Sequence, residues 1–317
     1  IFLRKVKNYF RLKPTQGTKI KLPRFIACVN NGNIAYVKIH LSRDDIDVNE
    51  KLLGITAIFS ACAKGHLEIA KMLIARDDLD INVTTVNDLT PLHIACSNEN
   101  SEIVKLLLTR QDIDINAKTD EGYTALMIAC QQGFTETVKI LVARDDVDIN
   151  SKLDESGMTA LFFACATGFD KIVNLLLDRD DLEINDDTAA MQHAVLRGHY
   201  EVVKLMVSRY DFNINTKKMN NRSGLYMASQ LGNIEMVKLF LSRDDIDVNT
   251  SSNQLMSAFS HACWKGNIEI VKLFLAKADL DINRKDSNEK SALHHACTGG
   301  HFEIVELLIS RLELDVN

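Results

Sequence analysis

One short motif recurs along almost the whole chain at a nearly constant distance. It consists of an acidic or amide residue, a β-branched residue and an asparagine. The closing asparagines are 33, 34, 34, 35, 30, 34, 34 and 34 residues apart, at Asn49, Asn82, Asn116, Asn150, Asn185, Asn215, Asn249, Asn283 and Asn317. Such a fixed period indicates an array of stacked supersecondary units, because a single globular core gives no reason for it.

The unit from 90 to 116 shows what one copy can fold into. Thr90 can cap a helix with its hydroxyl, and Pro91 suits the first helical position, where a missing N–H costs nothing. The second helix, from Glu102 to Leu108, carries an apolar stripe at helical spacing. Helices this short do not persist alone in water, so each unit must pack against its neighbours.

These residues resemble the ankyrin repeat, in T-P-L-H-x-A from Thr90, E-I-V-K-L-L-L from Glu102 and D-I-N from Asp114. The resemblance implies an all-α solenoid of helix-turn-helix units joined by β-hairpin-like fingers. It also implies a protein-protein interaction module or scaffold without enzymatic activity. We predict nine repeats in residues 23–317, at 23–49, 56–82, 90–116, 124–150, 159–185, 189–215, 223–249, 257–283 and 291–317.

The units vary at their caps and turns in a chemically consistent way. A Thr or Ser opens most of them and can satisfy a helix N-terminus. A glycine stands between the two helices of most units, where we expect a positive φ. Glu99 takes that place in the third unit, and we expect it to strain the turn.

The end of the second helix departs from the family pattern. Ankyrin repeats usually close with Gly-Ala-Asp-Val-Asn, whereas residues 43–49 here read Arg-Asp-Asp-Ile-Asp-Val-Asn and lack the Gly. We predict that the Asp pair forms the turn that stops the helix. An Arg precedes it in most copies, where the helix dipole favours a cation, so a stripe of Arg and Asp is expected along one edge.

Charge is distributed unevenly along the 317 residues. Residues 1–43 hold ten Lys and Arg and no acid, and the remaining 27 bases and 43 acids leave −16 for residues 44–317. The array should therefore repel nucleic acid. Residues 1–22 form a basic amphipathic segment, interpreted as a cap on the first repeat or as an arm that contacts an anionic membrane or nucleic acid.

The cysteines and the two ends of the sequence indicate the cellular location of the chain and whether the array continues. Six of the seven cysteines share one repeat position, so neighbouring thiols would be about 9–10 Å apart, too far for disulfides. We expect buried, reduced thiols and a cytoplasmic or nuclear location. The chain starts without Met and its last unit keeps an apolar second helix, so we expect the array to continue beyond it.

Three patterns imitate functional sites. His93 with Cys96, and His294 with Cys297, have the spacing of two metal ligands, but the other ligands are missing, so no zinc or other cofactor is predicted. Asp45-x-Asp47-x-Asn49 begins like a calcium loop, yet Glu50 stands where that loop needs Gly. The resemblance also makes Asn49, Asn82 and Asn116 candidates for asparagine hydroxylation.

A protein partner is expected on the concave surface, which in ankyrin proteins is made by the fingers and the first helices. The two positions before the glycine turn are small or polar in most units, but repeats six to eight bring hydrophobic and basic residues there. The predicted partner-binding residues are Leu196, Arg197, Met227, Gln230, Leu231, His261, Trp264 and Lys265. The alternatives are that Trp264 and Leu231 only stiffen the array, or that the chain is a passive spacer or regulatory arm of a larger membrane protein, toxin or effector enzyme.

Overall fold

The computed structural model describes residues 24–43, 45–52, 54–153, 156–184, 188–217, 221–252 and 256–311. These residues form eighteen helices, α2 to α19, in sequential pairs joined by turns. Their contacts divide the chain into two compact units, Ile1–Ala160 and Leu161–Asn317. The predicted segment 1–22 lies outside the described residues, as do Asn185 and Asn317.

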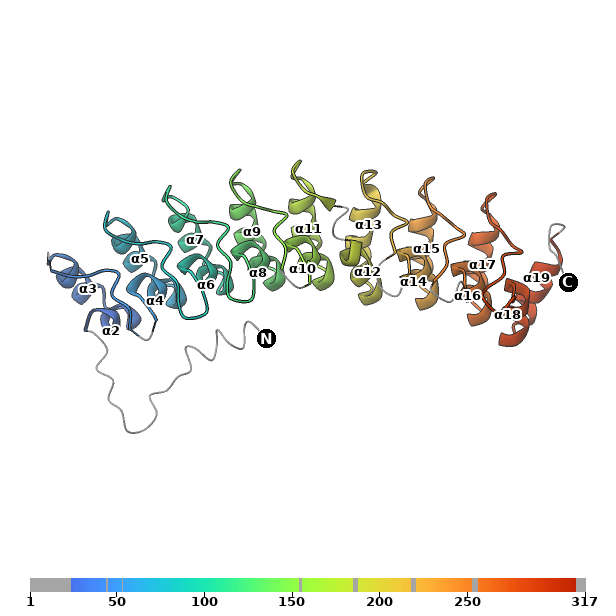
Figure 1. The fold of residues 1–317 in the computed structure, drawn as a ribbon, viewed down its shortest axis with the longest axis horizontal. Coiled ribbons are helices and arrows are strands. Elements are labelled where there is room, and N and C mark those ends of the chain that lie inside the picture. The colour runs from blue at the N-terminus through green and yellow to red at the C-terminus, as the bar shows by residue number, and fades with distance from the viewer. Residues whose placement is uncertain are drawn as a thin grey trace, which may run out of the picture. The chain divides into compact units, whose positions relative to one another are not determined.

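The first unit is built from two rows of short helices (Figure 1). Each first helix packs against the next first helix, and each second helix against the next second helix. The first helices are α2 (Arg24–Asn30), α4 (Ala57–Lys64), α6 (Pro91–Ser97) and α8 (Ala125–Gln132). The second helices are α3 (Ile34–Leu41), α5 (Leu67–Ile74), α7 (Ser101–Leu107) and α9 (Thr135–Val142). This is the solenoid of helix-turn-helix units that the sequence predicts.

The second unit repeats the same arrangement. Its first helices are α10 (Ala160–Thr167, whose first residue falls in the first unit), α12 (Thr188–Arg197), α14 (Gly224–Leu231), α16 (Ala258–Lys265) and α18 (Ala292–Gly299). Its second helices are α11 (Asp170–Leu177), α13 (Tyr200–Ser208), α15 (Ile234–Leu241), α17 (Ile268–Leu275) and α19 (Phe302–Ile309). One packed row consists of α12, α14, α16 and α18, and the other consists of α11, α13, α15, α17 and α19.

The links between helix pairs are tight turns. Among the described residues there is no strand, and two isolated bridges occur, Leu52 with Ile55 and Ser251 with Ser257. The fingers are closed by one or two backbone hydrogen bonds, such as Thr119 N–H to the Tyr123 carbonyl at 3.0 Å and Gly122 N–H to the Thr119 carbonyl at 2.8 Å. The predicted β-hairpin-like fingers are therefore hairpin turns without paired strands.

The caps form as the sequence predicts. The Thr90 hydroxyl accepts from the His93 N–H, and the His93 ring accepts from the Thr90 N–H, which makes a reciprocal cap on α6. Hydroxyl side chains also cap α4, α8, α14 and α16. Gly65 and Gly133, which end α4 and α8, have φ of 72° and 81°. Glycine is favoured there because it has no Cβ to clash in the left-handed region.

Glu99 has a φ of 57°, which confirms the expected strain in the third turn. Replacing Glu99 by Gly should therefore raise the free energy of unfolding by about 0.5–1 kcal/mol, after the entropy that Gly adds to the unfolded chain. Urea unfolding followed by circular dichroism measures this difference. Glu102→Gly, in the adjacent helix α7 where the backbone is helical, is the control and should be destabilising. Equal losses for both variants would contradict the strain.

The core lies between the two rows of helices within each unit. The largest fully buried side chains include Phe59, Phe240, Phe259 and Phe274. The cysteines at positions 62, 96, 130, 165 and 263 are buried as predicted, and burial raises the pKa of the Cys62 thiol. Cys297 and Cys28 differ from this expectation, because Cys297 is exposed and Cys28 is half-buried.

Helix length also bears on membrane insertion. The longest helix in the described part of the chain, α12, has ten residues. A membrane-spanning helix needs about twenty predominantly apolar residues. None of the described helices could therefore cross a bilayer.

Candidate functional site

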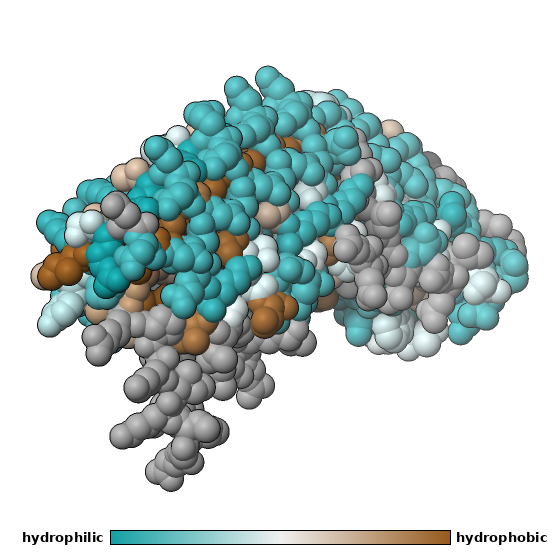
Figure 2. Space-filling view, turned by 60° about the vertical axis from the view of Figure 1, so that its left-hand side comes forward, coloured by the Kyte–Doolittle hydropathy of each residue, from teal (hydrophilic) through white to brown (hydrophobic). Residues whose placement is uncertain are grey.

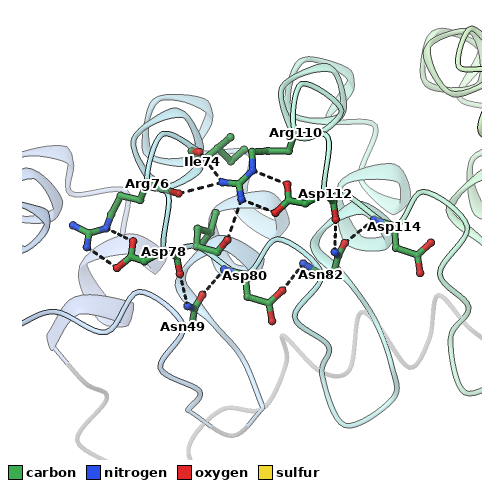
Figure 3. A network of polar contacts seen from close by, with 10 residues as sticks. Asn49, Ile74, Arg76, Asp78, Asp80, Asn82, Arg110, Asp112 and Asp114 are labelled. Carbon is green, nitrogen blue, oxygen red and sulfur yellow. Dashed lines mark hydrogen bonds and ion pairs between the residues drawn. The ribbon is translucent and has the colours of Figure 1, made fainter.

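Several of the arginines that follow second helices tie their helix pair to the preceding one (Figure 3). Arg110 holds Asp112 through two parallel hydrogen bonds of 2.8 and 2.7 Å. Its outer nitrogens also donate to the carbonyls of Ile74 at 3.3 Å, Arg76 at 3.1 Å and Leu79 at 3.3 Å. Because Ile74 is the last residue of α5, this guanidinium satisfies a carbonyl that the helix end leaves without a partner.

The same tie recurs along the array. Arg76, Arg144 and Arg243 donate to carbonyls near the ends of α3, α7 and α13, those of Leu41, Leu108 and Val207. The predicted stripe of Arg and Asp is thus confirmed. The Arg of the following helix pair therefore donates to the carbonyls at these helix ends. The second residue of the predicted Asp-Asp turn forms an ion pair with that Arg. Lys277 stands at this position after α17 and cannot make the same forked contact.

The closing asparagines make a second tie in the opposite direction. The Asn82 side chain donates to the Asp112 carbonyl at 2.6 Å and accepts from the Asp114 N–H at 2.8 Å (Figure 3). Asn49 and Asn116 bridge to the next helix pair in the same way. The amides of all three predicted hydroxylation candidates are therefore engaged in the array, and their modification stays a prediction.

His93 links α6 to the following finger. Its Nε2 lies 3.1 Å from the Tyr123 carbonyl, and its Nδ1 accepts from the Thr90 N–H at 3.1 Å. The ring is therefore neutral, with its proton on Nε2. Burial is the main cause that lowers the pKa of His93 from 6.5 to about 4.

This pKa predicts a loss of stability in mild acid. The unfolded chain binds a proton on His93 more tightly than the folded chain, so stability is unaffected above pH 6.5 and falls as the pH drops from 6.5 to 4. Between pH 7 and pH 5, we expect His93→Gln to lose about 1–2 kcal/mol less unfolding free energy than the unmodified chain. Urea unfolding at both pH values measures the difference, and parallel losses in the two proteins would contradict it.

The predicted partner-binding residues fall into two groups. Leu196, Leu231 and Trp264, on α12, α14 and α16, are 49, 50 and 41% exposed, and Arg197 and Lys265 beside them are also exposed. We call these five residues the first-helix row. Gln230 is half-buried at its edge, whereas Met227 and His261 are buried beneath it. A partner could therefore contact the residues of the first-helix row and Gln230 directly, but not the buried Met227 and His261.

Trp264 contacts two neighbouring side chains and remains 41% exposed. The Lys265 ammonium lies 4.5 Å from the centre of its ring, and the His261 ring meets it edge-on at 5.5 Å. His301, before α19, contacts the Trp264 carbonyl through Nε2 at 2.9 Å. The two ring contacts restrict the indole in the free chain, and the His301 contact holds its backbone.

Arg222 joins this surface although the sequence analysis did not select it. Its guanidinium lies 3.2 Å from Gln230 Oε1 and 5.6 Å from the centre of the Tyr226 ring. Its carbonyl accepts from the Gln192 side chain at 2.7 Å, which places this finger against α12 and α14. Its position in the sequence could have indicated this role, because Arg222 stands directly before the capping Ser223, where the finger joins α14.

The buried His261 carries no charge at neutral pH. Burial lowers its pKa to about 4, and the nearby positive charges of Lys265 and Arg222 add to this effect. Its Nδ1 is buried without a hydrogen-bond partner, while its ring packs against Tyr226 at 5.6 Å. Basic and aromatic side chains therefore surround the buried His261 ring. Nowhere in the described ranges do three His, Cys, Asp or Glu residues gather as metal ligands.

Comparisons with known proteins agree with this architecture. The family model of ankyrin repeats in three copies matches residues 25–119, 111–188, 181–252 and 226–317. The crystal structure of the human ASB11 ankyrin repeat domain is similar, with a TM-score of 0.56 and 24% identity over 69% of this chain and 98% of that chain. At this identity the likeness concerns the fold alone. No curated protein sequence matches.

The family matches and the packed helix pairs lead to the same result. Together the matched segments cover residues 25–317. Ankyrin repeats are in general protein-protein interaction modules without catalytic activity of their own. This chain belongs to the ankyrin repeat family.

Proposed function

We propose that the chain is a protein-binding module and that its partner docks on the first-helix row. The supporting observation is the placement of exposed hydrophobic residues. In the described part of the chain, Leu196, Leu231 and Trp264 are the large hydrophobic residues that are exposed on first helices. They lie on three helices that pack in sequence, with Arg197 and Lys265 next to them.

The surroundings make this row unusual. The corresponding positions on α4, α6 and α8 hold small or polar residues such as Ala63, Ser97 and Gln131. In the view of Figure 2, most of the visible surface of the molecule is hydrophilic, and hydrophobic residues appear in small separate areas. A hydrophobic row that contains one Trp and is accompanied by an Arg and a Lys has the composition of a binding hot spot, because such residues contribute most when they become desolvated.

The experiment compares the unmodified chain with the Leu231→Ala/Trp264→Ala double variant. Both are immobilised and used to retain proteins from a lysate, and each retained protein is then purified and tested for direct binding. Binding by the unmodified chain with at least a tenfold weaker Kd for the double variant supports the proposal. Equal binding to both proteins rejects the row, and a passive spacer would retain no specific protein.

A further inference from the structure

We infer that the partner segment that docks on the first-helix row is an acidic peptide with one bulky hydrophobic side chain. This inference rests on the proposed function and adds the chemistry of the ligand. It depends on where the second unit places its charges, which the overall charge of the chain conceals.

The first helices of the second unit carry no acidic side chain. The charged residues on α12, α14, α16 and α18 are Arg197 and Lys265, apart from histidines. The described finger residues beside them are mostly basic, namely Lys217, Arg222, Arg284, Lys285 and Lys290. Their acids are Asp286 and Glu289. This surface therefore has an excess of positive charge.

Asp286 does not offset that excess at the surface. It is buried, and its carboxylate accepts from the N–H groups of Asn288 and Lys290 at 2.8 and 3.0 Å. It also lies 2.9 Å from Nε2 of His295, which is buried as well. Its charge is thus held inside the last finger and is not available to a ligand.

The acidic residues of the second unit lie elsewhere. Glu201, Glu235 and Glu269 stand in the first turns of second helices, each within 3.7 Å of a Lys three residues later. Asp181, Asp211 and Asp245, which follow α11, α13 and α15, form ion pairs with arginines at the same helix ends. The basic residues of the first helices and fingers therefore lie on other elements than most acids of the second unit, whose 17 basic and 22 acidic residues give it a net charge of −5.

The first unit provides an internal contrast. Its described finger residues mix Glu50, Asp88, Asp120 and Glu121 with three lysines, and its first helices expose no large hydrophobic residue among those described. An acidic segment with a hydrophobic side chain would therefore select the second unit. Nucleic acid fits less well, because a long phosphate backbone would also meet the acidic edge.

The geometry sets the size of the ligand. Neighbouring helices of a packed row are about 10 Å apart, so the distance from α12 to α16 is about 20 Å. An extended peptide covers this distance with about six residues. A hydrophobic side chain on Leu231 and Trp264 would place its flanking carboxylates beside Arg197 and Lys265, with Arg222 at the edge of the same surface.

A peptide selection tests the inference with the full chain. A phage-displayed library of random linear peptides is selected on the immobilised protein, and the enriched peptides are synthesised with a fluorescein label for anisotropy measurements. We expect Asp and Glu to flank one Trp, Phe or Leu. Lys265→Glu should weaken binding about tenfold, whereas Lys272→Glu, on α17 and 53% exposed, should change it less than twofold.

A charge swap makes the test specific. The variant Lys265→Glu should regain affinity for a peptide in which one acidic residue is replaced by Lys. Circular dichroism of each variant confirms that it is folded. Failure of the swapped peptide to bind better than the acidic one would overturn the assigned charge pairing.

The remaining outcomes separate the inference from the proposed function. Peptides that lose affinity with Trp264→Ala but show no acidic enrichment would overturn the inference and leave the row as a binding site. Selection that yields no binder at the row would overturn both. A fluorescein-labelled single-stranded DNA that binds more tightly than any peptide, and is lost with Lys265→Glu, would overturn the acidic peptide in favour of nucleic acid.

Discussion

Replacing Arg243 by Ala is expected to lower the free energy of unfolding of the second unit by about 3 kcal/mol. This side chain is 4% exposed and donates to the carbonyls of Val207, Arg209 and Phe212 in the preceding helix pair. It also holds Asp245 through two hydrogen bonds of 2.7 and 2.6 Å. The variant leaves three carbonyls without their charged donor. Urea unfolding, with amide hydrogen exchange around residues 207–212, measures the loss.

Arg43 provides the matched control. It forms the same forked pair with Asp45, but its side chain is 57% exposed. Arg43→Ala should therefore cost much less, as is usual for an exposed ion pair that solvent screens. A loss for Arg243→Ala as small as that for Arg43→Ala would show that the carbonyl contacts contribute nothing. Arg243→Lys should fall between the two, because Lys keeps the charge but not the fork.

The second large effect concerns binding. Trp264→Ala should weaken the affinity for the partner by at least about 2 kcal/mol, which is roughly a 30-fold increase in Kd. The indole is 41% exposed and already contacts Lys265 and His261, so less ordering is needed when the partner binds. Isothermal titration calorimetry with the partner recovered on the unmodified chain gives the value.

Unfolding measurements separate binding from stiffening. If Trp264 and Leu231 only stabilise the array, their Ala variants lose unfolding free energy and keep their affinity, which would reject the hot spot. Phe302→Ala is the control for the loss of an exposed hydrophobic residue, since Phe302 is 70% exposed on α19, a second helix of the same unit. Its affinity for the partner should be unchanged.

Much of the fold follows from local sequence. Thr90 and Pro91 specify the start of α6, and glycines such as Gly65 specify the turns, because these effects depend on residues within one turn of the helix. The exposed row was predictable for a similar reason, since Leu231 and Trp264 precede such a turn. The family resemblance then assigned these helices to the concave surface.

Other features depend on neighbours that local sequence does not reveal. The Arg110 contact with Ile74 joins residues 36 positions apart, so the helix end that it caps could not be deduced from its own repeat. Met227 and His261 share a helix side with Gln230 and Trp264 at three-residue spacing, yet packing buries them. Arg222 was missed because its role requires a finger to fold back on α14.

The ties between helix pairs also bear on how the chain would come apart under tension. Several junctions within each unit resist separation through an arginine that reaches back, an asparagine that reaches forward, or both. A pulled unit should therefore open one helix pair at a time, beginning at its weakest junction. Lys277 makes the junction before α16 and α17 the weaker one in its neighbourhood, while the Asn249 bridge there remains. Mechanical rupture would thus reach the last two pairs before it passed the buried Arg243.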